Sequence, residues 1–148
     1  MSRSGYNEGG DQENWDYIRW RGAVTSAIRG KKGQAFLREM REALDAIPIK
    51  ELAAEVLVED KVAVDGESPK ACALGVIALK RKLDVSRIDI DFWEGIHHSF
   101  NISNALAREI IWINDEAYYP KNDAERWRAV RWWVEANIIP LPVKPIAK

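Results

Sequence analysis

The residues best suited to bind a charged ligand lie in one basic stretch, residues 17–41. This stretch carries seven cationic side chains against one acidic residue, Glu39. In its middle, the tetrapeptide 30–33 reads Gly-Lys-Lys-Gly. The N–H groups that open a helix form a favourable phosphate site, and lysines beside them add charge. The sequence therefore predicts a contact with phosphate or nucleic acid through Arg19, Arg29, Lys31 and Lys32.

The same charges can instead be neutralised inside the fold. Residues 84–116 carry seven acidic residues against two arginines, and the whole chain has a net charge of −1. Basic helices packed beside this acidic stretch would explain the pattern without any ligand. A basic stretch without a recognised binding fold favours this second interpretation. The tetrapeptide is also no P-loop, because Lys32 stands where Ser or Thr is required and Gly22 lies too far upstream.

Few residues are suited to metal binding or to acid–base chemistry. His97 and His98 follow Glu94, with Asp89 and Asp91 nearby. Adjacent residues on a helix point about 100° apart, so both imidazoles rarely reach one metal. We expect a surface pair of histidines.

The remaining polar candidates also favour structural roles. Cys72 is the only cysteine, which excludes an intramolecular disulfide, and we expect a buried and inert thiol on the apolar face of a helix. The run Asn114–Glu116 is expected to form a turn ahead of two tyrosines. No set of residues meets the geometric requirements of an active site, so we predict no enzymatic activity, no cofactor and no metal.

Tryptophan is unusually abundant, with seven residues in 148. Trp132 and Trp133 are consecutive, so at least one of them points away from the buried stripe of its helix. An exposed Trp132 beside Arg128 and Arg131 has the composition of an anchor in a protein interface. The alternative is that another element covers this tryptophan. The interface hypothesis predicts a protein partner, and self-association would also satisfy it.

The elements that must position these residues are mainly helical. Apolar residues at helical spacing predict helices over 15–29 and 34–47, with Pro48 ending the second. A third helix follows the loop 65–69 and carries Cys72, Val76, Leu79 and Leu83. Later helices are predicted around 90–97, from an N-cap at Ser103 to Ile113, and from an N-cap at Asp123 to Ile138. We expect a compact bundle of five or six helices.

One segment favours β structure instead. Val56, Val58, Val62 and Val64 share one parity around a turn at 59–61, which predicts a small β-hairpin. The fold class is therefore mainly α, with a minor β part. We expect a flexible tail over 1–12, a single domain over 13–139, and an extended proline-rich tail over 140–148.

The cellular location follows from what the sequence lacks. It has a single cysteine, no apolar signal core near Met1, and no run approaching the ~20 apolar residues of a membrane span. We therefore expect a cytoplasmic protein that is not embedded in a membrane.

A long stretch near the start of the chain consists of Tyr17–Val24 and Ser26–Glu39. It resembles the opening of a widespread family of small proteins from phage and prophage genomes. Shorter pieces resemble its later pattern, so the resemblance covers roughly residues 17–138: Cys72–Gly75, Ala105–Ala107, Asn114–Glu116, Arg126–Trp127 and Trp132–Val134. The family has no established activity, so the resemblance implies a phage or prophage origin and no site residues. By analogy with other small phage proteins it favours action on a host or phage macromolecule.

Three hypotheses follow. The leading one is an accessory factor that binds a host or phage protein, in the host cytoplasm if it is phage-encoded. The second is nucleic-acid binding through residues 17–41. The third, an enzyme of unknown class, has the least support.

Overall fold

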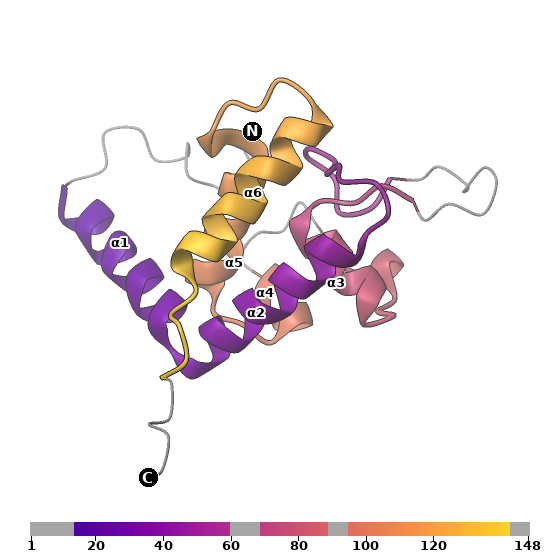
Figure 1. Cartoon of the computed structure of the whole chain (residues 1–148). Helices are drawn as coiled ribbons and strands as arrows, with labels where there is room; N and C mark the ends of the chain where they lie inside the picture. Colours follow the sequence, from indigo (N-terminus) through magenta and orange to yellow (C-terminus); the bar gives the residue numbers. More distant parts are fainter. Residues whose placement is uncertain (1–13, 60–68, 89–94, 143–148) are drawn as a thin grey trace, which may run out of the picture.

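Six α-helices make up most of the computed structural model, which describes residues 14–59, 69–88 and 95–142 (Figure 1). A short 3-10 turn, η2 (Val85–Arg87), and a π-helical turn, η3 (Ile113–Ala117), join them. The prediction of a mainly α protein with five or six helices is confirmed. The helices are α1 (Asn14–Arg29), α2 (Lys31–Ala46), α3 (Ala73–Lys80), α4 (Ile96–Phe100), α5 (Asn104–Trp112) and α6 (Asp123–Asn137).

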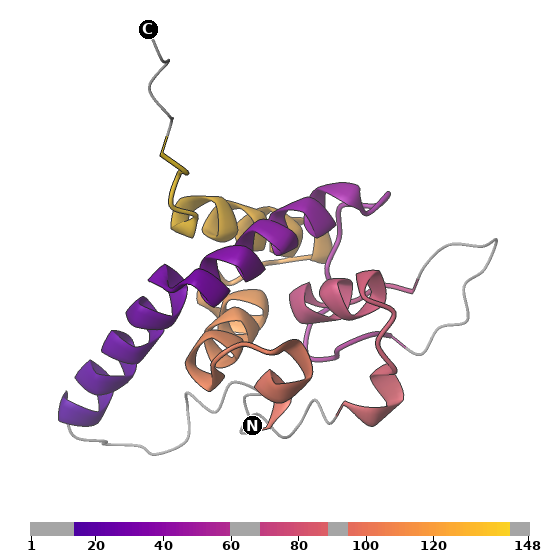
Figure 2. The same ribbon diagram turned by 90° about the horizontal axis from the view of Figure 1, so that it is seen from below.

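Helix α2 lies at the centre of the packing. It contacts α6 and α3, and Figure 2 shows α2 and α6 side by side above α3, α4 and α5. Its apolar stripe is buried as predicted. Because Ile47 precedes Pro48 it takes an extended conformation, and α2 ends at Ala46. The buried apolar side chains of α2 are Phe36, Leu37, Met40, Ala43 and Leu44.

Helix α3 is buried on all sides. Every residue from Ala71 to Ala78 is buried, as expected for a helix without a polar face. The segment that contains Leu57 packs closely against α3, since a Cβ on Gly75 would lie 1.9 Å from the carbonyl oxygen of Leu57. Cys72 is buried, as predicted, but it precedes the first turn of α3 as the N-cap.

The predicted β-hairpin is not supported. Val58 forms one isolated antiparallel bridge with Ala71, so this segment pairs with the approach to α3. The second half of the prediction, with Val62 and Val64, lies outside the described residues. The alternation of valines gave a wrong prediction because the odd-numbered face of this segment is the buried one. Leu57 is buried, whereas Val56 is exposed.

Helix α1 is attached by a small apolar contact. Among its described side chains, which begin at Ile18, Val24 is fully buried. The helix contacts α5 and the start of α2, and both views show it standing apart from the other helices (Figures 1 and 2). An ion pair from Arg21 to Glu109 of α5 supplements this contact.

The predicted starts of α5 and α6 hold to within one residue, whereas α2 begins at Lys31, three residues before the predicted start at 34. Ser103 caps α5, since its Oγ accepts a hydrogen bond from the backbone N–H of Leu106 at 3.1 Å. The cap of α6 is Asn122 instead of Asp123, because the extended residue 122 aims its Oδ1 at the N–H of Glu125 at 2.8 Å. The helix predicted around 90–97 overlaps the observed α4 (Ile96–Phe100) only at Ile96 and His97, and 89–94 lie outside the described residues.

The ends of the chain are described in part. Residues 1–13 and 143–148, which hold most of the two predicted tails, lie outside the described residues. Pro140, Leu141 and Pro142 follow α6 without regular secondary structure and are exposed. No described helix is both long enough and apolar enough to cross a membrane.

Candidate functional site

Helix α6 separates the two consecutive tryptophans. Val130 and Val134 are fully buried against the core, and Trp133 beside them is 6% exposed. Trp132 points to the other side of the helix and is 63% exposed. The prediction that at least one of the pair points away from the buried stripe is confirmed, and Trp132 is that residue.

Two tyrosines extend the exposed apolar area around Trp132. The ring of Tyr118 meets the Trp132 ring edge-on, with 5.9 Å between centroids and 85° between planes. Tyr119, next in the chain, is 88% exposed. Arg128 lies one turn before Trp132 on α6 and makes no hydrogen bond or ion pair with any described residue. We call Tyr118, Tyr119, Arg128 and Trp132 the aromatic surface.

The backbone beneath the tyrosines is unusual. The π-helical turn η3 ends at Ala117, directly before Tyr118. Tyr119 has a φ of 46°, in the left-handed region that residues other than glycine seldom adopt. A bulky residue there is strained, and π-turns and strained residues both concentrate at functional sites. The most exposed aromatic ring of the described chain thus sits on a strained residue.

Charges behind the aromatic surface join it to α1. Arg21 donates two hydrogen bonds, of 2.8 and 3.0 Å, to the carboxylate of buried Glu109. The pKa of the Tyr118 hydroxyl is raised, first by burial and then by the negative charge of Glu109. The Tyr118 hydroxyl therefore stays neutral, and Glu109, whose charge acts on it, is held by Arg21 of α1.

The third predicted interface residue, Arg131, faces elsewhere. Its guanidinium donates hydrogen bonds of 2.8 and 3.1 Å to the carboxylate of Asp45, at the end of α2. The hydrogen bond from Arg131 lowers the pKa of Asp45, and the carboxylate in turn raises the pKa of Arg131. Arg131 thus joins α2 to α6, and we leave it out of the aromatic surface.

The basic stretch divides into two groups. Three of its arginines bind other parts of the fold: Arg21 pairs with Glu109, Arg38 donates to the carbonyl oxygen of Ile139, and Arg41 pairs with Glu135. The four predicted phosphate-binding residues are exposed, and their side chains make no hydrogen bond or ion pair with another described residue: Arg19, Arg29, Lys31 and Lys32.

Three of these four cations lie at the junction of α1 and α2. Only Gly30 separates the helices, and Arg29, Lys31 and Lys32 are its exposed neighbours in the sequence. Gly33 permits this junction, because a Cβ there would lie 1.9 Å from the carbonyl oxygen of Ala27. Arg19 lies ten residues earlier on α1, about 15 Å along the helix axis, and is separate from this cluster.

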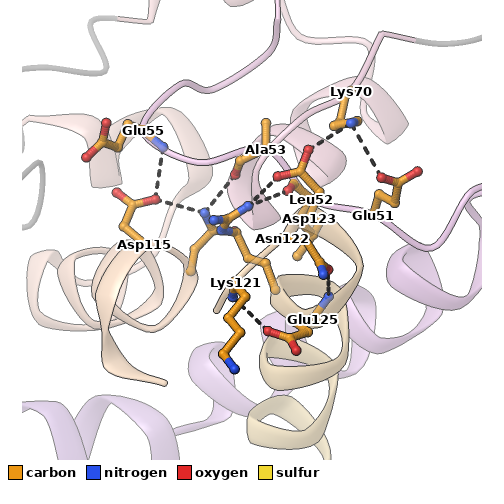
Figure 3. Close-up of polar contacts among 12 residues, drawn as sticks. Glu51, Leu52, Ala53, Glu55, Lys70, Asp115, Lys121, Asn122, Asp123 and Glu125 are labelled. Atoms are coloured by element: carbon orange, nitrogen blue, oxygen red, sulfur yellow. Dashed lines mark hydrogen bonds and ion pairs between the residues drawn. The ribbon is translucent and has the colours of Figure 1, made fainter. Parts of the chain in front are cut away.

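The run Asn114–Glu116 forms part of η3 instead of the predicted turn. Asn114 is buried and bridges three segments: its Oδ1 accepts from the N–H of Ala73 at 3.0 Å, and its Nδ2 donates to the carbonyl of Ala53 at 3.0 Å. Asp115 accepts from the N–H of Glu55 at 3.1 Å (Figure 3). The sequence offered no periodic signal for this role, because the partners lie 41 to 61 residues away.

The same irregular segment is held by α6. Buried Arg126 donates from its Nη1 to the carbonyl oxygen of Leu52 at 3.0 Å. Asp123 accepts from Lys70 at 2.8 Å, and Glu51 lies 3.5 Å from the same ammonium (Figure 3). Hydrogen bonding to Asp123 raises the pKa of Lys70, so this lysine stays charged and is unsuited to act as a nucleophile. The cluster organises the loop over 51–55.

The histidines do not form a metal site with other described residues. The rings of His97 and His98 lie 4.0 Å apart between centroids. No group of three or more histidine, cysteine or acidic side chains within 14–59, 69–88 and 95–142 could hold a metal ion. Glu94, Asp89 and Asp91 lie outside these ranges.

A pocket of about 390 Å³ opens beside the start of α2. Two of its charged lining residues pair with each other, because Arg81 donates to both carboxylate oxygens of Glu39. Lys32, at the rim, is the lining cation that makes no such contact with a described residue. The pocket adds little to the site beyond that charge.

Comparisons of the chain with protein-family models, curated proteins and solved structures returned no match. The fold and the site define a helical protein with an exposed aromatic surface on α6 and a basic cluster where α1 meets α2.

Proposed function

We propose that the protein acts by binding another protein through the aromatic surface, as an accessory factor of phage or prophage origin. The observation that carries the proposal is the exposure of Trp132, a large apolar side chain that the fold leaves 63% in solvent. The resemblance to small phage proteins supports the proposed origin.

Composition and backbone strain support the same function. Tryptophan, tyrosine and arginine are the residue types most enriched among energetically dominant interface residues, and they make up the whole aromatic surface. The left-handed backbone of Tyr119 costs on the order of 1–3 kcal/mol. Its ring is almost fully exposed, so burial of that ring within the chain does not offset this cost. A partner that covers the ring would offset it.

The test is affinity capture from a nuclease-treated bacterial lysate with the immobilised full chain. Trp132→Ala should weaken the captured complex about 30-fold or more, corresponding to ~2 kcal/mol for a dominant interface residue. Ile49→Ala is the matched control, because Ile49 is also an exposed apolar residue but lies outside the aromatic surface. A second copy of the chain, added to the lysate, tests self-association in the same assay. Equal capture of the lysate proteins and of the second copy by the wild type and Trp132→Ala would contradict the proposal.

A second function, nucleic-acid binding, is favoured by the cluster of Arg29, Lys31 and Lys32. These cations contact no described carboxylate, and the first turn of α2 contains no acidic residue. Replacing all three with glutamine should weaken a salt-sensitive DNA or RNA mobility shift and reduce the slope of log K against log salt by ~2.7. Arg19→Gln is the control, since it removes a cation remote from the cluster. No shift by the wild type at low salt would eliminate this function.

A further inference from the structure

A second exposed apolar feature follows the end of α6. Leu141 is 70% exposed, Ile139 is half exposed, and Pro140 and Pro142 flank Leu141 in solvent. Proline presets the backbone φ, so a segment with several prolines loses less conformational entropy when it binds in extended form. The segment 139–145, Ile-Pro-Leu-Pro-Val-Lys-Pro, thus has the composition of a recognition peptide.

Hydrogen bonds hold the start of this segment in place. The N–H of Ile139 donates to Oε1 of buried Gln34 at 2.8 Å, and its carbonyl oxygen accepts from Arg38 at 2.8 Å. Gln34 also donates to the carbonyl oxygens of Ile28 and Asn137, at 2.7 and 3.0 Å. Ile139 is therefore fixed against α2.

The described part of this segment, residues 139–142, leads away from the loop that carries Tyr118 and Tyr119. In Figure 1 the chain leaves the lower end of α6, opposite the loop that carries Tyr118 and Tyr119. Ile139 lies seven residues after Trp132, about 10 Å along the helix axis. To reach Trp132, the chain would have to reverse directly at Pro140–Pro142, where the prolines favour an extended course.

The aromatic surface has the geometry to receive such a segment. Proline-rich peptides dock in grooves lined by aromatic rings. The rings of Trp132 and Tyr118 meet edge-on at 85°, and both residues are exposed, so their apolar surfaces are available to a pyrrolidine ring. In a polyproline helix, residues three apart share an edge, so a peptide bound in this form presents Ile139 and Pro142 together.

We propose that the aromatic surface of one copy binds the proline-rich segment 139–145 of a second copy. This inference rests on the proposed function, because it names the partner of the same surface. Each contact joins two different surfaces, so a variant lacking the segment and a variant lacking the aromatic surface complement each other.

The experiment is sedimentation equilibrium on the full chain and two variants. The first is Trp132→Ala, and the second carries alanine in place of Pro140, Pro142 and Pro145. The wild type should associate as its concentration rises, and each variant alone should associate at least tenfold more weakly. An equimolar mixture of the two variants should regain association, because one retains the segment and the other retains the surface. Thermal melting and Ile49→Ala control for folding and for nonspecific stickiness.

The inference is wrong if the wild type stays monomeric or if the mixture does not regain association. It is also wrong if the proline variant associates as the wild type does, or if Ile49→Ala loses association as Trp132→Ala does. If the proline variant still associates and Trp132→Ala does not, the occupant is another part of the second copy, and the proposed function survives. If Trp132→Ala both self-associates and captures lysate proteins as the wild type does, both proposals fail.

Discussion

Replacing Asn114 by alanine tests whether the buried amide holds the loop over 51–55 to α3. The change removes the acceptor for the N–H of Ala73 and the donor to the carbonyl of Ala53, whose residues are 0% and 1% exposed. Water cannot replace either partner without entering the core. Each buried group left unsatisfied costs about 1–3 kcal/mol, so we expect a loss of about 2–6 kcal/mol. This is a large part of the ~5–15 kcal/mol that stabilises a typical domain.

Urea denaturation followed by circular dichroism measures this loss. The midpoint should fall while the slope m stays constant, because the surface exposed on unfolding hardly changes. Asn137→Ala is the matched control: its amide donates one hydrogen bond, of 2.8 Å, to the carbonyl of Trp133 within the same helix. We expect that control to cost about 1 kcal/mol or less. The reasoning is refuted if Asn114→Ala is no more destabilising than Asn137→Ala.

Three further predictions concern the core, the pH dependence and the helix junction. Trp133→Ala should destabilise the fold by about 3–5 kcal/mol through a core cavity, whereas exposed Trp132→Ala should change the melting temperature little; equal losses in a thermal melt would contradict the separation of the pair. A hydrogen bond from Arg81 holds the pKa of Glu39 below its usual 4.5, so the stability it contributes is present above pH 4.5 and is lost as pH falls through the lowered pKa. Glu39→Gln should flatten the acid limb of a plot of urea midpoint against pH, and an unchanged limb would rule this out. Gly33→Ala should cost about 1–3 kcal/mol, because the added methyl meets the backbone of α1; an unchanged urea midpoint would show that the junction is not close-packed.

The local elements could be predicted from the sequence because their causes lie within a few residues. The stripe from Phe36 to Leu44 repeats at helical spacing, and Pro48 prevents continuation beyond Ile47. Ser103 caps α5 through a hydrogen bond to a residue three positions on. Consecutive tryptophans must diverge on any helix, so the sequence also predicted that one of them leaves the buried stripe.

The candidate site depended on contacts that no local pattern contains. Only the packing of α6 on α2 decided that Trp133 is buried and Trp132 exposed. The same packing gave Arg131 its partner Asp45, 86 residues away, and removed it from the predicted interface.

The missing hairpin has a similar cause. Val58 forms its bridge with Ala71, whereas the alternation of valines predicted pairing with residues nearer in the sequence. Local sequence patterns determine which backbone conformation has a low free energy and which face of an element is apolar. Which apolar residue is covered, and which charge is neutralised, depends on distant segments that meet only when the whole chain packs.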